Sequence, residues 1–85
     1  KNGYSIGETE DSTEKKEEGN KEFSQGNYEQ AIGWYIEALE ICPKNRTERA
    51  LYHGNIAACY MKMVDYFIIL LLLIVFGFVG YLVFN

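Results

Sequence analysis

The amino-acid sequence predicts an all-α protein in which two short amphipathic helices are followed by a third helix that leads into an apolar one. Apolar residues between positions 28 and 42 recur at helical spacing. Gly26 and Pro43 divide the chain into segments of helix length. Residues 67–84 carry no charge at all. With 85 residues, the chain has room for one small unit or a few helices.

The composition is segregated along the chain, and this limits the kinds of partner. Residues 1–30 are strongly polar, the net charge is −4, and the acidic residues gather between Glu8 and Glu22. Nucleic-acid binding requires a basic patch that meets phosphate, so we do not expect it here. We interpret the acidic segment as the solvated face of a helix.

The first helix is predicted over Ser12–Gln25, which is rich in Glu and Lys and poor in helix breakers. Asp11 or Ser12 is expected to cap its start. Residues 1–11 are polar and contain Gly, so we predict a flexible lead-in. Phe23 is nearly the only large apolar residue of this helix, which therefore needs a packing partner.

A turn at Gly26-Asn27 is predicted to separate the first helix from a second one at about Tyr28–Cys42. Gly suits the left-handed position that ends a helix, and Asn27 with Gln30 matches a capping-box variant. Pro43 ends the second helix. Because the turn is tight, we expect the two helices to be antiparallel neighbours. The apolar face of the second helix comprises Tyr28, Ala31, Ile32, Tyr35, Leu39 and Cys42.

A third helix is expected to begin after Asn45, which can cap it, with Glu48 three residues further on. Its predicted apolar stripe consists of His53, Ile56, Ala57, Tyr60, Met63 and Val64.

The segment Phe67–Phe84 is predicted to be a membrane-spanning helix. Its 18 residues correspond to about 27 Å of helix, close to the hydrocarbon thickness of about 30 Å. Tyr66 and Tyr81 are placed near the two interfaces. A buried core helix is the alternative, but nothing else in this chain is large enough to cover a helix that is apolar on all sides.

Basic residues precede the apolar segment, and only Asn85 follows it. The positive-inside rule then predicts that the preceding helices lie in the cytosol and that the apolar segment is a tail anchor. The basic residues are Lys44, Arg46, Arg49 and Lys62.

The sequence contains no recognisable catalytic, metal or cofactor motif. Cys42 and Cys59 are too far apart for a CxxC pair, and His53 is the single histidine. We interpret the two cysteines and His53 as helix packing residues. Phosphate loops and nucleophile elbows are absent from the sequence. We therefore expect no enzyme activity, no catalytic residue, no metal, no cofactor and no small-molecule substrate.

Small residues and Pro recur at a fixed interval. Gly19, Ala31 and Pro43 are successively twelve residues apart. Ala31 and Tyr35 are separated by three residues and form an Ala-x3-Tyr motif. A tetratricopeptide repeat combines a Gly in its first helix with Ala-x3-Phe in its second and a closing Pro. Small residues let two helices approach closely, and aromatic residues fill the space between them. The predicted repeat-packing residues are Gly19, Tyr28, Ala31, Tyr35, Ala38, Pro43 and Tyr60.

The stretch EEGNKEFSQGNYEQAIGWYIEALEICPKN resembles the first tetratricopeptide repeat of co-chaperones, and the resemblance covers about Thr13–Asn45. It implies a repeat at 12–43 and a partial second repeat at 44–65, and it ends where the apolar, transmembrane-like helix at 66–85 begins. The sequence departs from the family pattern at Lys15 and Glu18, where large apolar residues are usual, and at Glu22, where Tyr is usual.

The resemblance also implies a binding chemistry. Members of this family often hold the C-terminal carboxylate of a partner, typically the acidic tail of a heat-shock chaperone, by cations and amide donors. The matching residues here are Lys16, Asn20 and Asn55. Two further basic residues usually come from a third repeat, which this sequence lacks, and Glu17 and Glu18 are expected to repel an acidic tail.

The sequence is compatible with three functions. The chain can be a co-chaperone or adaptor module that is anchored in a membrane through residues 67–84, with a cytosolic repeat. Alternatively, it can be a truncated or alternatively spliced form with an incomplete carboxylate clamp and no independent chaperone binding. A module that binds proteins without any use of a free C-terminus is the third candidate.

Overall fold

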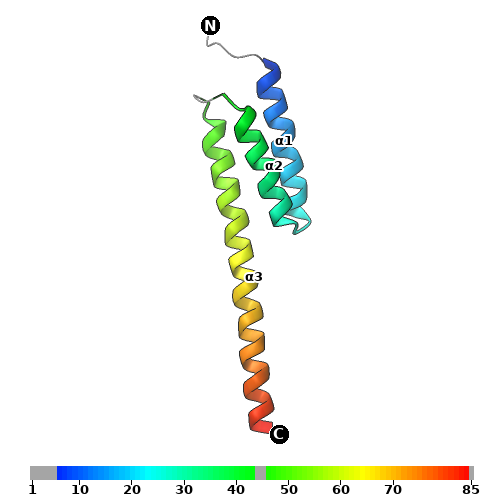
Figure 1. Cartoon of the computed structure of the whole chain (residues 1–85), viewed down its shortest axis with the longest axis vertical. Helices are drawn as coiled ribbons and strands as arrows, with labels where there is room; N and C mark the ends of the chain where they lie inside the picture. Colours follow the sequence, from blue (N-terminus) through cyan, green and yellow to red (C-terminus); the bar gives the residue numbers. More distant parts are fainter. Residues whose placement is uncertain (1–5, 44–45, 85) are drawn as a thin grey trace.

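The computed structural model describes residues 6–43 and 46–84, which form three α-helices and no strand. These are α1 (Ile6–Ser24), α2 (Tyr28–Ile41) and α3 (Glu48–Phe84). Figure 1 shows α1 and α2 as an antiparallel pair, with α3 returning along α2 and then projecting far beyond the pair. The molecule is accordingly long and narrow, with extents of 72 × 19 × 13 Å. The predicted all-α class with a helical repeat and a long apolar helix is confirmed.

Helix α1 begins at Ile6, so the predicted helix start at Ser12 was wrong, and so was the flexible lead-in where it covers residues 6–11. Residues 1–5 of the predicted lead-in lie outside the described residues. Residues 8–18 contain neither Gly nor Pro, and helix formation therefore does not have to stop at Ser12. Ser12 lies inside the helix and does not cap it. Its hydroxyl is buried and donates a hydrogen bond to the phenol oxygen of Tyr52 on α3, at 2.6 Å, which makes a helix-interior Ser favourable.

The turn between α1 and α2 has the geometry that the sequence predicts. Gly26 has a φ of 82°, the left-handed conformation that a residue without Cβ adopts at little cost. The Asn27 amide donates to the carbonyl of Glu22 at 2.9 Å, and the Gly26 amide donates to that of Phe23 at 3.0 Å. This pair of bonds is a Schellman motif, and it satisfies carbonyl groups at the end of α1.

The predicted capping box at Asn27 does not form. Asn27 occupies the N-cap position of α2, but its side chain makes no capping hydrogen bond. The side-chain amide instead donates to the Glu22 carboxylate at 2.9 Å and to the side-chain oxygen of Gln25 at 3.3 Å. Asn27 thereby ties α2 back to the end of α1, because these acceptors lie close to it across the tight turn.

Close contact between α1 and α2 depends on Gly19. A Cβ atom at this position would lie 2.6 Å from Cε1 of Tyr35, a distance at which the atoms would collide. Ala31 and Ala38 are fully buried on α2, which brings the helix backbones together. The apolar face predicted for α2 is confirmed: its buried members are Ala31, Ile32, Tyr35 and Cys42, and Tyr28 and Leu39 are half-buried.

The apolar stripe predicted for the third helix is correct for Ile56 and Met63, which pack against the core, and wrong for its other four members, which are exposed. The residues of α3 that pack against α2 are Tyr52, Ile56, Cys59 and Met63. Tyr60 was predicted to pack in the repeat, but it is 54% exposed, as is Val64. His53 and Ala57 are also exposed, so the interpretation of His53 as a packing residue was wrong. Apolar residues surround most of this helix, so their spacing does not determine which side meets α2.

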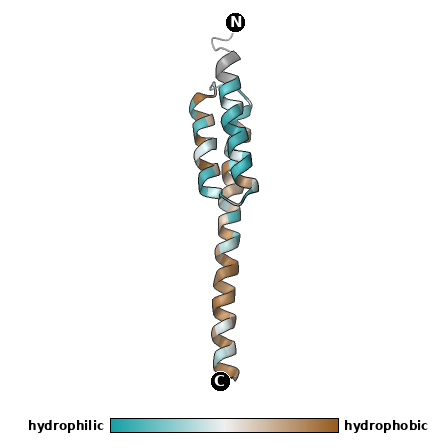
Figure 2. Cartoon of the chain, turned by 90° about the vertical axis from the view of Figure 1, so that its right-hand side faces the viewer, coloured by the Kyte–Doolittle hydropathy of each residue, from teal (hydrophilic) through white to brown (hydrophobic). Residues whose placement is uncertain are grey.

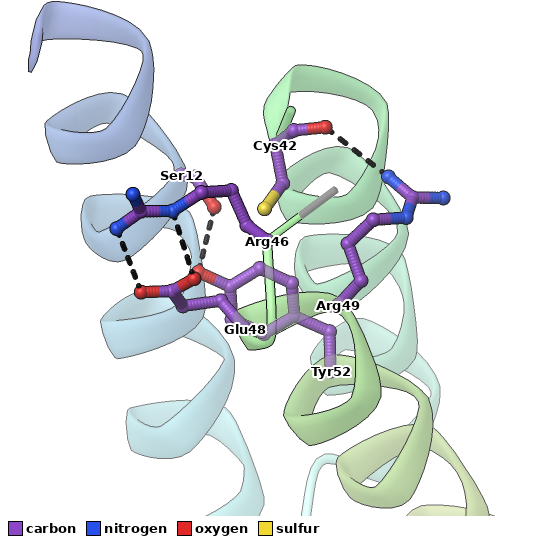
Figure 3. A network of polar contacts seen from close by, with 6 residues as sticks. All are labelled: Ser12, Cys42, Arg46, Glu48, Arg49 and Tyr52. Carbon is purple, nitrogen blue, oxygen red and sulfur yellow. Dashed lines mark hydrogen bonds and ion pairs between the residues drawn. The ribbon is translucent and has the colours of Figure 1, made fainter. Parts of the chain in front are cut away.

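Two arginines organise the connection from α2 to α3 (Figure 3). Arg49 donates to the carbonyls of Leu39 at 2.8 Å and Cys42 at 3.1 Å, which have no partner further along α2. Arg46 pairs with the carboxylate of Glu48 through two hydrogen bonds of 3.1 and 3.2 Å. The predicted cap, Asn45, lies outside the described residues.

Helix α3 runs without interruption from the packed pair into the apolar segment. Figure 2 shows the change from a packed region that mixes hydrophilic and hydrophobic residues to a more hydrophobic extension. Among the described residues, α3 is the one helix that is long and apolar enough to cross a membrane, and none of its most apolar window is buried. The alternative of a buried core helix is therefore not what this fold contains.

Candidate functional site

A groove opens between α1 and α3, with side chains of α2 at its base. It has a volume of about 260 Å³ and is lined by Asn20, Phe23, Tyr35, Asn55 and Ala58. Asn20 and Phe23 come from α1, Tyr35 from α2, and Asn55 and Ala58 from α3. The fold thus brings together two of the three predicted carboxylate donors, which are 35 positions apart in the sequence.

The amide of Asn20 is held in one orientation by Tyr35. The Tyr35 hydroxyl donates a 2.6 Å hydrogen bond to Oδ1 of Asn20. Because this bond occupies the acceptor oxygen, the Nδ2 group remains as a donor of two hydrogen bonds. The side chain of Asn55 has no hydrogen-bond partner among the described residues. The groove therefore presents amide donors from two helices.

Lys16, the third predicted donor, does not line this groove. It is half-buried one turn before Asn20 on α1. The hydrogen bond from Arg46 is the main cause of the lowered pKa of Glu48 on α3, and the positive charge of Lys16 is the smallest contribution. Of the three predicted donors, Lys16 is thus the one that the fold leaves outside the groove.

The acidic residues that were expected to repel a tail lie elsewhere. Glu17 and Glu18 line a separate concavity of about 370 Å³, together with Glu14, Lys15 and Trp34. Glu48, which sequence reasoning treated only as part of a helix start, forms an ion pair with Arg46 at 3.1 Å.

The contacts of Lys15 show how the fold accommodates a lysine at a position where the repeat pattern usually has a large apolar residue. Its Nζ lies 5.1 Å from the centre of the Trp34 ring and 3.4 Å from the Glu37 carboxylate. The position usually filled by a large apolar residue is thus covered by the aliphatic part of a lysine. The ammonium group meanwhile makes a cation–π contact and an ion pair.

The buried thiol and phenol groups of the core are suited to packing and are poorly reactive. Burial raises the pKa of the Cys59 thiol, and Cys59 is fully inaccessible. Burial also raises the pKa of Tyr35, with a smaller contribution from Cys59. A thiol in this environment stays protonated and is a poor nucleophile. Within residues 6–43 and 46–84, no cluster of three His, Cys, Asp or Glu residues could hold a metal ion.

Sequence reasoning missed the role of the Tyr35 hydroxyl, although a signal was present. The repeat pattern has Phe at this position, and the additional oxygen of Tyr is the group that orients Asn20. Of the predicted packing residues, Gly19 on α1 meets Tyr35 on α2, Ala31 belongs to the same buried cluster as Tyr35, and Ala38 is buried in a second cluster with Tyr52 of α3. Tyr28 is half-buried beside them, and Pro43 follows the end of α2.

Comparison with known proteins gives one family. The family model described as TPR repeat matches residues 19–63. Protein unc-45 homolog B of Danio rerio is 40% identical over 62 residues, which cover 72% of this chain and 7% of that protein. Human DnaJ homolog subfamily C member 7 is 40% identical over 48 residues, or 56% of this chain and 9% of that protein.

A third relative is a plant protein. Translocon at the outer membrane of chloroplasts 64 of Pisum sativum is 34% identical over 67 residues, which cover 78% of this chain and 11% of that protein. The chain thus spans about a tenth or less of the length of these curated relatives. No solved structure gives a significant match.

Proposed function

Because the chain belongs to the TPR repeat family and is therefore a protein-interaction module, we propose that its groove binds the C-terminal carboxylate of a protein partner. The single observation that carries this proposal is the convergence of Asn20 and Asn55 on the groove. Tyr35 supports it by leaving the Nδ2 donor of Asn20 available. The co-chaperone resemblance and the similarity to a DnaJ homolog favour the acidic tail of a heat-shock chaperone as the partner.

The number of hydrogen-bond donors and cations in the groove determines how strongly it can bind a carboxylate. Hydrogen bonds to a charged group contribute roughly 1.5–3 kcal/mol each, so two amides supply about 3–6 kcal/mol. Association itself costs at least about 4 kcal/mol in lost freedom. Lys16 adds little, because it does not line the groove. We therefore expect binding in the millimolar range or weaker for this segment alone, and tighter binding when further repeats add cations.

The test is a titration of the whole chain in lipid nanodiscs, followed by the NMR signals of the side-chain amides of Asn20 and Asn55. The probes are an acidic peptide with a free C-terminal carboxylate and the same peptide with a C-terminal amide. We expect both signals to shift with the free acid and not with the amidated peptide. Equal shifts with both peptides would instead indicate a module that does not use a free C-terminus.

Two substitution pairs assign the contacts. Asn55→Ala is expected to abolish the free-acid response, and Asn27→Ala, at an exposed Asn outside the groove, is expected to preserve it. Lys16→Ala is expected to weaken the response slightly, with Lys21→Ala as its exposed control on the same helix. A response that survives Asn55→Ala would contradict the proposed site. Asn20→Ala is less informative, because it also removes the hydrogen-bond acceptor of Tyr35.

We further propose that residues 67–84 anchor the chain in a membrane, with the repeat in the cytosol. The side chains of this segment are exposed throughout, up to 90% for Phe84, and form an apolar surface far larger than soluble proteins usually leave in water. The basic residues before the segment favour a cytosolic location for the repeat. The name of the pea relative refers to an outer membrane, which is consistent with this.

A glycosylation sequon added after Phe84 tests the anchor in a microsomal translation assay. We expect the added site to be glycosylated and the chain to resist extraction by carbonate. An unmodified chain that carbonate removes would contradict insertion.

The alternative function is a truncated or alternatively spliced isoform without independent chaperone binding. The observation that favours it is the exposed side of α3 at Tyr60 and Val64, where the second helix of another repeat would pack. Helix α3 continues through this point and does not turn back. The absence of any free-acid response in the peptide titration would support this alternative. A transcript that joins the codons after Asp65 to a longer repeat protein would support it independently.

A further inference from the structure

We propose that the end of the α1–α2 pair that carries the turn rests in the lipid headgroup layer, so that the repeat is docked rigidly on the bilayer surface. This inference depends on the proposed membrane anchor. An anchor alone does not require it, since a flexible linker could hold the repeat far from the membrane. The partner that we assign to this end of the repeat is a lipid surface.

Three aromatic side chains join the turn to the beginning of the apolar segment. The rings of Phe23 and Tyr28 meet edge to face with centroids 5.1 Å apart. The ring of Tyr28, the first residue of α2, lies 5.9 Å from that of Tyr66. Tyr66 directly precedes the uncharged run. The turn therefore lies at the level along α3 where the apolar segment starts.

The dimensions of a bilayer place this level in the headgroups. Residues 67–84 span about 27 Å, slightly less than a hydrocarbon core of about 30 Å, so Tyr66 is drawn to the hydrocarbon boundary. The interfacial layer outside that boundary is about 5–7 Å thick. Tyr residues favour this layer, because their rings are apolar and their hydroxyls remain hydrated. Tyr28 and Gln25 are thus expected to contact lipid headgroups.

The absence of a flexible joint makes this docking rigid. Helix α3 is continuous from Glu48 to Phe84, and Tyr52 and Cys59 pack against α2 above the membrane level. Asn55 lies twelve residues before Phe67, or about 18 Å along the helix. The groove therefore opens into water roughly 10 Å beyond the headgroups. A partner can reach it only with a tail that approaches the membrane surface.

The charges near the turn indicate which lipid surface fits. Two are basic and three are acidic, so this end has no excess of positive charge that would attract anionic lipid. We therefore expect docking on zwitterionic phosphatidylcholine without any need for anionic lipid. The charged residues are Lys21, Glu22, Glu29, Lys62 and Asp65.

Tryptophan quenching in phosphatidylcholine vesicles tests the proposal with the full chain. Trp34→Phe removes the single native tryptophan, and each variant then receives one new tryptophan. Gln25→Trp reports on the exposed turn, Thr47→Trp on the exposed opposite end of the repeat, and Phe76→Trp on the apolar segment. The quenchers are phosphatidylcholine with a headgroup nitroxide and phosphatidylcholine brominated in mid-chain. Far-UV circular dichroism confirms that each variant keeps its helix content.

We expect mid-chain bromines to quench the Phe76→Trp variant strongly. We expect the headgroup nitroxide to quench the Gln25→Trp variant several-fold more than the Thr47→Trp variant. If the Phe76→Trp variant is quenched while the other two respond equally to the nitroxide, the anchor is correct and the docking is wrong. If the Phe76→Trp variant is not quenched, both proposals are wrong.

Discussion

Ser12 on α1 and Tyr52 on α3 share a buried hydrogen bond of 2.6 Å, although they lie 40 positions apart in the sequence. This bond joins the first helix to the third directly, across the end of the repeat that lies far from the α1–α2 turn (Figure 3). Ser12 is 1% exposed, so water cannot replace either partner. Each hydroxyl therefore depends on the other.

Loss of both of these hydroxyls should cost less than the sum of the two single losses. Ser12→Ala or Tyr52→Phe leaves a buried hydroxyl without a partner, and we expect each to lower the free energy of unfolding by about 1–3 kcal/mol. The double variant should lose less than the sum of the two. Urea unfolding of the chain in detergent micelles, followed by Trp34 fluorescence, measures the three values. Additive losses would show that the two hydroxyls act independently.

Gly19→Ala should destabilise the repeat despite the better helix propensity of Ala. The new Cβ would lie 2.6 Å from the Tyr35 ring, which is buried and cannot move aside. Overpacking of this kind costs about 1–3 kcal/mol. Gly33→Ala is the matched control on α2, because a Cβ atom added there would have no neighbour within 4 Å. We expect this control to gain up to about 1 kcal/mol in the same unfolding measurement; a loss equal to that of Gly19→Ala would contradict the steric explanation.

The Cys59 thiol should react only when the repeat opens. It is completely buried, and burial raises its pKa, so it stays protonated at pH values where an exposed thiol ionises. We expect slow alkylation by iodoacetamide in the folded chain and fast alkylation in urea, measured by mass spectrometry. Gln25→Cys provides an exposed thiol for comparison. Equal rates at the two positions would mean that the core opens freely.

The start of α3 should become less stable in acid. Hydrogen bonds from Arg46 lower the pKa of Glu48, so the folded chain favours the ionised carboxylate. The stabilisation is complete above the ordinary pKa of a Glu, near 4.3, and is lost as the pH falls through the lowered value. NMR shifts of the Arg49 and Ala50 amides should follow this titration. Glu48→Gln should abolish it, and Glu40→Gln, at an exposed Glu on α2, should leave it unchanged.

Much of the local structure followed from single residues. Gly26 specifies the turn, because its left-handed backbone is unfavourable for residues with a Cβ atom. Pro43 follows the end of α2, and the spacing of Ala31, Tyr35 and Ala38 identifies the buried face of that helix. These features depend on interactions within a few residues or within one helical period.

The candidate site was predicted only in part, for a reason that concerns distance along the chain. The repeat pattern identified Asn20 and Asn55, and the structure places both at the groove. The pattern did not reveal that Tyr35 orients Asn20 or that Lys16 stays outside the groove. These relationships join side chains of different helices, and their geometry exists only after the helices have packed.

The sequence by itself determined that the chain is helical, that it carries a TPR repeat and that residues 67–84 are apolar enough to span a membrane. Only the tertiary structure decided which side of α3 packs. Ser12 is a buried partner because Tyr52 reaches it. Cys59, and not Tyr60, faces α2, because a helix with apolar residues on most sides takes its orientation from the surface it meets.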